Sequence, residues 1–389
     1  MRKLLLVVLV AAGIQQPTPQ VPVQPATQPP ATAPLMPPLV LVRAIEPPKT
    51  PLPSEADSAK ITRFSFIAYG DTRGANDGVE LHREHQALIE AMIAKAKTLV
   101  STPFPIRFVV QSGDAVLNGR DGNQWNISFV PVIEKLTRDA DIPYLFSVGN
   151  HDVTTLPLGD PQRARGLKNS FDAMSKLIPA EGSPRRMNGY FTYAFGFGNA
   201  FFVMLDSNIA SDQAQLAWVT RQLEGLDRAR YHHVFAVFHH PPFSSGPHGG
   251  DLIEPQTEAI RALYMPLFRK HHVRATFTGH DHMLDHWVER YEDGGKPYRM
   301  DDLLSGGGGA PTYTYKGEPN LNAYLDNGSA QHVQVQHLIR PGATAGENPN
   351  HFIVVQVDGD KLSLEVIGVG PTPYRPYGKD RLDLNGPTS

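Results

Sequence analysis

Short apolar runs alternate with amphipathic segments along the chain after about residue 60. The runs are rich in Val, Ile and Phe and end at Gly, Pro or polar residues, a pattern that predicts buried strands. These predicted strands lie at 63–70, 106–113, 143–149, 199–208, 232–243 and 274–279. Segments with apolar residues at helical spacing lie at 79–100, 130–140, 211–226 and 254–270. A final hairpin is expected at 351–369, turned at Gly359. The pattern therefore predicts a sheet-rich core covered by helices.

The two ends of the chain have a different composition. Residues 1–16 hold two positive charges followed by an apolar run, which is typical of an export signal. The alternatives are an uncleaved membrane anchor, which would tether the chain to a membrane, and a buried N-terminal element. Residues 17–57 contain 13 prolines, which predicts a disordered linker. We therefore expect one folded domain at 58–372, a polar C-terminal tail at 373–389, and an exported protein that is periplasmic, secreted or membrane-anchored.

Composition excludes several classes of function. The chain has 36 basic and 39 acidic residues, for a formal net charge of −3, so no basic surface indicates nucleic acid as a structural partner. It has no cysteine, which excludes disulfides, thiolate zinc sites, iron–sulfur clusters and cysteine nucleophiles. Hydrophobic residues make up 41% of the chain, enough for a sizeable core. Any bound metal must therefore use imidazole, carboxylate or amide ligands.

Five fragments place such ligands directly after predicted strands: GDTRG at 70–74, GDAVLNG at 113–119, GNHD at 149–152, HHPP at 239–242 and GHDH at 279–282. Any one of them is more often a turn with a capping Asp than a site. Together they predict a two-metal centre, in which ions about 3.5–4 Å apart hold a phosphoryl group. Mn, Zn, Fe and Ni suit these donors. The candidate ligands are Asp71, Asp114, Asn150, His239, His280 and His282.

In this order the five fragments resemble the motifs of the calcineurin-like metallophosphoesterases, which include purple acid phosphatases and cyclic-nucleotide phosphodiesterases. The resemblance spans about 64–310. It implies an α+β fold, a four-layer αββα sandwich in which two central mixed β-sheets are flanked by helices. It also implies that Asp114 bridges two divalent or trivalent metal ions. Asp71 and His282 would hold the first ion, and the second would be held by Asn150, His239 and His280.

The resemblance gives His151 the role of the acid that protonates the leaving oxygen. In the alternative interpretation, this imidazole only orients Asn150. The chain departs from the family at Arg73, where many members have a metal-binding His. Leu117 replaces the Tyr that purple acid phosphatases carry, so no choice of iron follows.

A guanidinium has no lone pair to give to a metal, so we expect Arg73 to bind phosphate oxygens as a catalytic and substrate-binding residue. Alternatively, it pairs with a carboxylate such as Asp71 or Asp121. We also expect His240 to contact substrate. His248 is interpreted as a solvated loop residue, with closure over substrate as the alternative, and the glycine run at 305–311 as a packing turn rather than a phosphate-facing loop.

The sequence thus predicts an exported, dinuclear-metal-dependent phosphoesterase that hydrolyses small phosphate esters, with monoesters favoured. One alternative is a phosphodiesterase acting on nucleotides or lipids, which uses the same ligands. The other is a non-catalytic scaffold of the same fold, which the substitutions at Arg73 and Leu117 favour. The six retained ligands and His151 argue against the scaffold.

Overall fold

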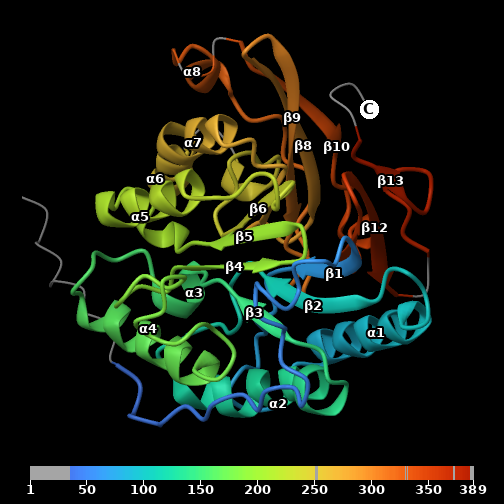
Figure 1. Cartoon of the computed structure of the whole chain (residues 1–389). Helices are drawn as coiled ribbons and strands as arrows, with labels where there is room; N and C mark the ends of the chain where they lie inside the picture. Colours follow the sequence, from blue (N-terminus) through green and yellow to red (C-terminus); the bar gives the residue numbers. More distant parts are fainter. Residues whose placement is uncertain (1–35, 250–252, 329, 331, 371–372, 386–389) are drawn as a thin grey trace, which may run out of the picture. The chain divides into compact units, whose positions relative to one another are not determined.

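The computed structural model describes residues 36–249, 253–328, 330, 332–370 and 373–385 (Figure 1). The expected export signal or anchor at 1–16 and the first part of the proline-rich linker lie outside these residues. Among the helices of the described part, none combines the length and the apolar character needed to cross a membrane.

One of the two sheets carries the first three predicted strands. Its strand order is β13-β12-β11-β1-β2-β3, with β1 parallel to β2, β2 parallel to β3 and β11 antiparallel to β1. The strands are β1 Arg63–Tyr69, β2 Ile106–Gln111, β3 Tyr144–Phe146, β11 Asn350–Asp358, β12 Lys361–Val369 and β13 Leu382–Asp383. The predicted hairpin is confirmed as β11 and β12, and Gly359 in its turn has φ +60°. The three parallel strands all end at the same edge of this sheet.

The other sheet has the order β10-β8-β9-β7-β6-β5-β4 and is also mixed. Its central strands β5, β6, β7 and β9 run parallel to one another. The strands are β4 Tyr193–Phe197, β5 Ala200–Met204, β6 His233–Val237, β7 Ala275–Thr278, β8 Leu284–Asp293, β9 Lys296–Ser305 and β10 Gln334–Ile339. The hairpin of β8 and β9 was not predicted from the sequence.

Phenylalanines fill the space between the two sheets. Phe66 on β1 lies with its ring centroid 5.1 Å from that of Phe202 on β5 and 5.6 Å from that of Phe277 on β7. Phe108 on β2 lies 5.2 Å from Phe202. Such tilted and edge-to-face pairs contribute about 0.5–1.5 kcal/mol each beyond the burial of their area. This aromatic layer fixes one sheet against the other and brings their strand ends together.

Helices cover the outer faces of both sheets. Buried residues of α1, α2 and α4 belong to the same core as the sheet of β1, and those of α5, α6 and α7 pack on the other sheet. The helices are α1 Arg83–Leu99, α2 Val130–Glu134, α3 Asn150–Val153, α4 Pro161–Met174, α5 Gln213–Glu224, α6 Pro255–Ala259, α7 Met265–Lys270 and α8 Asn322–Leu325, with π-helical turns at 124–129, 135–139 and 260–264. The expected four-layer α+β sandwich is confirmed.

The helix α4 was missed, although its N-terminus carries a recognisable signal. Asp160 caps it by accepting a hydrogen bond from the backbone N–H of Gln162 at 2.8 Å, and Pro161 occupies the first helical position. An Asp followed by Pro is a common helix start, because proline lacks the N–H that would have no partner there.

The structure moves the N-terminal domain boundary. Instead of a disordered linker up to residue 57, the compact unit begins at Pro37. Ile45 is fully buried, and its N–H donates to the carbonyl of Ala173 at 2.9 Å. Glu55 forms an ion pair with Arg185 at 2.7 Å. The proline content excludes regular structure, but an extended segment can still fold when the domain supplies its hydrogen-bond partners.

The C-terminal boundary moves as well, because part of the expected polar tail packs on the domain. Strand β13 pairs with β12, and Leu384 is buried. The Tyr377 hydroxyl lies 2.8 Å from Nδ1 of His286. The domain therefore extends beyond residue 372.

Candidate active site

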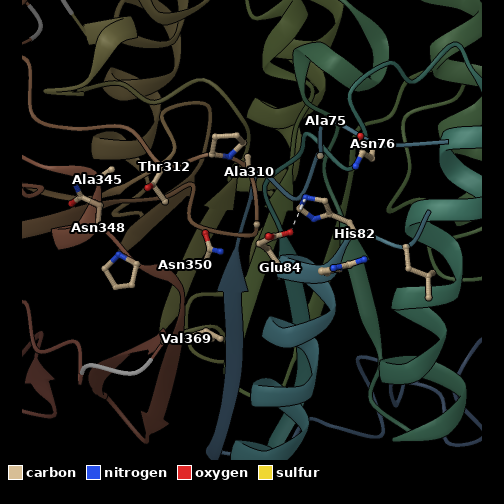
Figure 2. A pocket seen from close by; sticks show the side chains of 18 of the residues that line it. Ala75, Asn76, His82, Glu84, Ala310, Thr312, Ala345, Asn348, Asn350 and Val369 are labelled. Carbon is tan, nitrogen blue, oxygen red and sulfur yellow. Dashed lines mark ion pairs between the residues drawn. The ribbon is translucent and has the colours of Figure 1, made fainter. Parts of the chain in front are cut away.

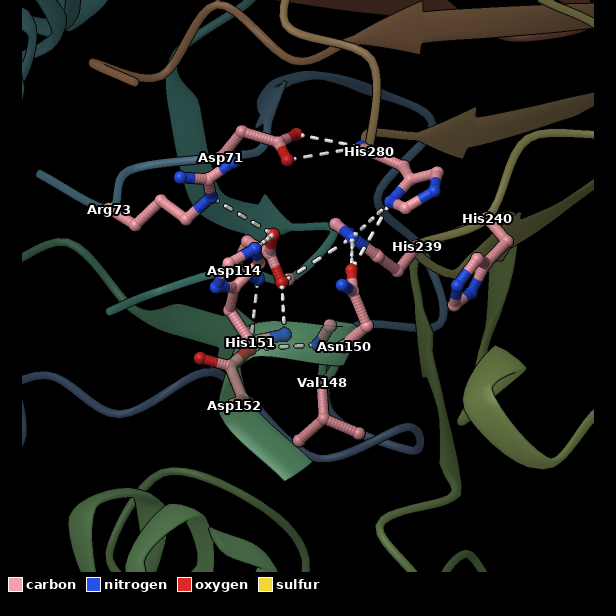
Figure 3. Close-up of polar contacts among 12 residues, drawn as sticks. Asp71, Arg73, Asp114, Val148, Asn150, His151, Asp152, His239, His240 and His280 are labelled. Carbon is pink, nitrogen blue, oxygen red and sulfur yellow. Dashed lines mark hydrogen bonds and ion pairs between the residues drawn. The ribbon is translucent and has the colours of Figure 1, made fainter. Parts of the chain in front are cut away.

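The six predicted ligands follow the carboxyl ends of five strands: β1, β2 and β3 in one sheet and β6 and β7 in the other. Three of them have left-handed backbone conformations, with φ of +63° at Asp71, +55° at Asp114 and +76° at His280. A residue with a Cβ in this region costs on the order of 1–3 kcal/mol and persists only where surrounding contacts enforce it. The turns thus bring the side chains of Asp71, Asp114 and His280 near one another, with Asn150 and His239 beside them (Figure 3).

Four donors converge at the position expected for the second ion. Oδ1 of Asn150 lies 2.8 Å from Nε2 of His239 and 3.2 Å from Nδ1 of His280. Nε2 of His239 lies 3.2 Å from Nδ1 of His280 and 3.4 Å from Oδ1 of Asp114. Donors this close together suit a metal ion, which would hold each of them at about 2.0–2.2 Å. These residues therefore fit a bound ion.

Hydrogen bonds prepare both imidazoles for metal binding. Nδ1–H of His239 donates to the carbonyl of Ser112 at 3.1 Å, which leaves the lone pair on Nε2. Nε2–H of His280 donates to the Glu254 carboxylate at 2.7 Å, which leaves the lone pair on Nδ1. Carboxylate–histidine pairs of this kind fix the tautomer and raise the basicity of a metal-binding ring.

Glu254 and its partner His248 were not recognised as site residues. Nδ1 of His248 lies 3.0 Å from Oε1 of Glu254, and its ring centroid lies 4.1 Å from that of His280. The interpretation of His248 as a solvated loop residue was therefore wrong. In the sequence, Glu254 precedes Pro255 and resembles an ordinary helix start, so no local signal connects it to the site.

His240 is placed behind the ligands rather than at an opening. Its side chain is buried, its Nδ1 lies 2.9 Å from the Ser207 hydroxyl, and its ring centroid lies 4.6 Å from that of His280. His240, Glu254 and His280 each have a donor atom close enough to share an ion. The Ser207 hydroxyl already contacts Nδ1 of His240, and Nδ1 of His280 faces the predicted ligands. We therefore interpret His240 and Glu254 as residues that hold His280 in place. This placement argues against the predicted contact of His240 with substrate.

The two buried carboxylates differ in their electrostatics. Burial alone would raise the pKa of Asp114, but its interactions with His239 and His151 lower it to about 2. Burial and the neighbouring Asp114 carboxylate raise the pKa of Asp71 well above its ordinary value. Two carboxylates this close favour a positive charge between them.

The guanidinium of Arg73 supplies part of this positive charge. Its Nε lies 3.5 Å from Oδ2 of Asp114, and its Nη2 lies 3.2 Å from Nε2 of His282. Nε2 of His282 is also 3.7 Å from Oδ1 of Asp71. The alternative that Arg73 pairs with a nearby carboxylate agrees with this geometry, although the partner is Asp114 and not Asp71 or Asp121. Arg73 lies among the donors expected for the first ion.

His151 lies at the rim of the site. Its Nδ1–H donates to the carbonyl of Leu117 at 2.7 Å, and its Nε2 is 4.0 Å from Oδ2 of Asp114. Its side chain is 29% exposed, in contrast to the buried Asp114. Within the described residues, its ring makes no hydrogen bond to Asn150. The ring therefore presents Nε2 to the place where substrate would meet the ligands.

The glycine run packs tightly, as expected. A Cβ on Gly308 would lie 2.2 Å from the carbonyl oxygen of Gly70, and one on Gly306 would lie 2.1 Å from that of Asp281. The N–H of Gly308 donates to the Gly70 carbonyl at 2.8 Å. These glycines hold the loop after β9 against the turn that carries Asp71.

The model of the calcineurin-like phosphoesterase family matches residues 69–284, more than half of the chain. The chain belongs to this family. Membership confirms the resemblance drawn from the five motifs. It also confirms the expected class of the domain, a metal-dependent phosphoester hydrolase. The calcineurin-like phosphoesterase domain of this chain contains all six predicted ligands.

Individual relatives are distant. The chain is 23% identical over 230 residues to rat serine/threonine-protein phosphatase CPPED1, covering 57% of this chain and 66% of that protein. It is 24% identical over 168 residues to Fe(3+)-Zn(2+) purple acid phosphatase 12 of Arabidopsis thaliana, covering 42% and 33%. The structure of purple acid phosphatase PPD1 from yellow lupin superposes with a TM-score of 0.57 at 16% identity, covering 84% of this chain and 54% of that one. Each match covers less than two thirds of the relative's length.

Proposed function

We propose that this calcineurin-like phosphoesterase is an exported, metal-dependent phosphatase that hydrolyses small phosphate monoesters. The observation that carries the proposal is the convergence of Asp114, Asn150, His239 and His280 at donor separations of 2.8–3.4 Å, beside the partly exposed His151. The names of the similar proteins, a serine/threonine-protein phosphatase and a purple acid phosphatase, support the assignment as a phosphatase.

When bound, a metal ion supplies Lewis-acid activation of water and of the phosphoryl group. The chain would hold it with Asp114, Asn150, His239 and His280. Of the two ions expected from the sequence, the geometry supports the second one, at these four residues. Arg73 lies among the donors expected for the first ion. The identity of the metal is left open among Mn, Zn, Fe and Ni.

The protein's own groups then handle charge and protons. His151 protonates the leaving oxygen through Nε2, because the carbonyl of Leu117 holds the proton on Nδ1 and a second proton makes the ring an acid. Arg73 binds phosphate oxygens with a charge that it cannot lose. Its side chain is 17% exposed, so part of the guanidinium faces the space where substrate would lie.

A cavity of about 690 Å³, whose lining includes neither Arg73 nor a predicted ligand, opens beside the residue that follows Arg73, and we propose that it takes the alcohol part of the ester (Figure 2). Gly74 and Pro311 line it, and the Pro311 carbonyl accepts a hydrogen bond from His282 at 2.8 Å. The charged side chains in its lining are Arg83, Glu80 and Glu84, with His82 beside them. More acidic than basic groups here disfavour the additional phosphates of a nucleotide. We therefore expect a neutral or cationic alcohol as leaving group.

The reaction class can be tested with the full chain loaded separately with Mn, Zn, Fe or Ni. We expect kcat/KM for p-nitrophenyl phosphate to exceed that for bis(p-nitrophenyl) phosphate by at least about tenfold, or about 1.4 kcal/mol in transition-state stabilisation. Choline phosphate should be preferred over ATP. A preference for the diester would move the assignment to a phosphodiesterase. Metal-loaded, folded protein without turnover on either ester would favour the scaffold alternative.

Export is a separate part of the proposal, supported by the composition of residues 1–16. Expression of the full chain in a bacterial host, followed by fractionation and N-terminal sequencing, tests it. We expect the protein outside the cytoplasm, either shortened at its N-terminus or retained in the membrane fraction. Full-length protein confined to the cytoplasm would contradict this prediction.

A further inference from the structure

The donors expected for the first metal ion are Asp71, Asp114 and His282, and the guanidinium of Arg73 lies among them (Figure 3 shows Arg73 beside Asp71 and Asp114). It contacts two of the three, at 3.5 Å from Asp114 and 3.2 Å from His282. Arg73 follows Asp71 by two residues in the GDTRG turn, so the backbone that places the carboxylate also places the guanidinium.

The hydrogen bonds of His282 make this contact exclusive. Its Nδ1–H donates to the Pro311 carbonyl at 2.8 Å, so the only lone pair of the ring is on Nε2. That atom accepts the N–H of Arg73. One lone pair cannot accept a hydrogen bond and bind an ion at the same time. While Arg73 holds this position, His282 is lost as a ligand.

The charges lead to the same result. The side chains of Asp71 and Asp114 are 0% and 1% exposed, so solvent does little to screen them. Arg73 remains charged under all conditions relevant to a protein, so it supplies a positive charge here that needs no ligands of its own. Among the described residues, the donor atoms of Asp71 and Asp114 group with that of His239. Because His239 already serves the second position, an ion added here would have only the two carboxylates as donors of its own and would lie against the guanidinium. The residues therefore fit an ion at the second position and do not fit one at the first.

The ring of Tyr313 limits the movement of His282. It stacks on the imidazole at a centroid distance of 4.1 Å and an interplanar angle of 18°. With Tyr313 on one face and Pro311 at Nδ1, His282 cannot turn away from Arg73 without breaking both contacts. The arrangement is a packed feature of the site.

We propose that the Arg73 guanidinium takes the place of the first metal ion, so that this site holds a single ion, bound by Asp114, Asn150, His239 and His280. The proposal refines the metal site of the proposed function, but the number of ions is measured independently of turnover. Arg73 is then the second positive group that faces the phosphoryl oxygens, in place of a second ion.

Manganese is a suitable probe, since a lone Mn²⁺ and a pair of exchange-coupled ions give different paramagnetic resonance spectra. The full chain is titrated with Mn²⁺, dialysed, and examined by elemental analysis and by resonance spectroscopy. We expect one ion per chain and the six-line spectrum of an isolated ion in the wild-type protein. Arg73→His restores an imidazole at this position, and we expect it to bind a second ion and to give a coupled spectrum, as ions about 3.5–4 Å apart do.

Arg73→Lys is the matched control, because it keeps the charge and should stay at one ion. Asn150→Ala should lose the ion of the wild-type protein. Two ions per wild-type chain would overturn the proposal. So would folded Arg73→His protein that still binds one ion, since Arg73 would then not be what excludes the other. Wild-type protein with one ion and no activity would reject the proposed function and leave this inference standing.

Discussion

Asp152 connects two of the ligand-bearing turns, and its replacement by Asn is a sharp test of how the site is held. Its carboxylate is buried and accepts three backbone N–H bonds. Oδ2 accepts from Asp114 and from Gly149, both at 2.8 Å, and Oδ1 accepts from Ala115 at 2.9 Å. The turn after β2 and the turn after β3 are therefore joined through one side chain.

The size of the effect follows from these three bonds. In Asp152→Asn, the amide oxygen can replace Oδ2 and keep two of them. The amide NH₂ then faces the N–H of Ala115, so one buried donor loses its acceptor. Burial and the Asp114 carboxylate raise the pKa of Asp152 well above its ordinary value, so these bonds are not counted as bonds to a charged group. Because a buried donor left without a partner costs about 1–3 kcal/mol, we expect the free energy of unfolding to fall by about 1–3 kcal/mol.

Urea unfolding followed by circular dichroism measures this change. The matched control is Asp160→Asn at the N-cap of α4, where Asn and Asp are about equally good caps and the loss should stay below about 0.5 kcal/mol. A lower urea midpoint for Asp152→Asn at an unchanged slope is the expected result. If the two variants unfold together, the three bonds do not stabilise the turns and the reasoning is refuted.

Three other variants test separate parts of the structure. Asn150→Ala should remove metal and activity together, because it deletes an oxygen donor in contact with two imidazoles; elemental analysis and assay check this, and full turnover would contradict the site. His151→Ala should retain metal and lower kcat by about 10²–10⁴ on poor leaving groups, with a smaller loss on nitrophenyl esters, and an equal loss on both would argue against the acid role. His233 has its pKa lowered by burial from 6.5 to about 4, so the unfolded chain binds the proton first and stability falls as pH drops from 6.5 toward 4. Between pH 7 and 5 this should cost about 2 kcal/mol in urea unfolding, and His233→Gln should reduce the slope, whereas parallel curves would contradict the assignment.

The candidate ligands that the structure brings together could be found in the sequence because most of them depend on local features. Asp71, Asp114, Asn150 and His280 directly follow a glycine at the end of an apolar strand, and the turn chemistry is visible within five residues. The strands that carry these residues were predictable for the same reason. The layers then followed from the resemblance to a known family, which spacing alone would not have provided.

Apart from helix α4, the main features that were missed depend on contacts between distant parts of the chain. Arg73 meets His282 across 209 positions, and Glu254 meets His280 across 26. No pattern within a window of residues encodes such contacts. The same holds for the segment at 37–57, where proline content predicts disorder and only the carbonyl of Ala173 and similar groups on the domain make folding possible.

The ligands also hold one another in place, which explains how the strained turns persist. The N–H of Asp71 donates to the carbonyl of Gly113 at 3.0 Å, next to Asp114, and so ties the ends of β1 and β2. The N–H of His280 donates to the Asp71 carboxylate at 3.0 Å and ties β1 to β7 in the other sheet. The left-handed conformations at all three residues are thus enforced by bonds between the turns. Because the donors of these bonds are backbone N–H groups, which no metal needs, the fold itself fixes the ligand positions. Metal binding then requires little rearrangement at the second position, and at the first the same rigidity keeps Arg73 between its acceptors.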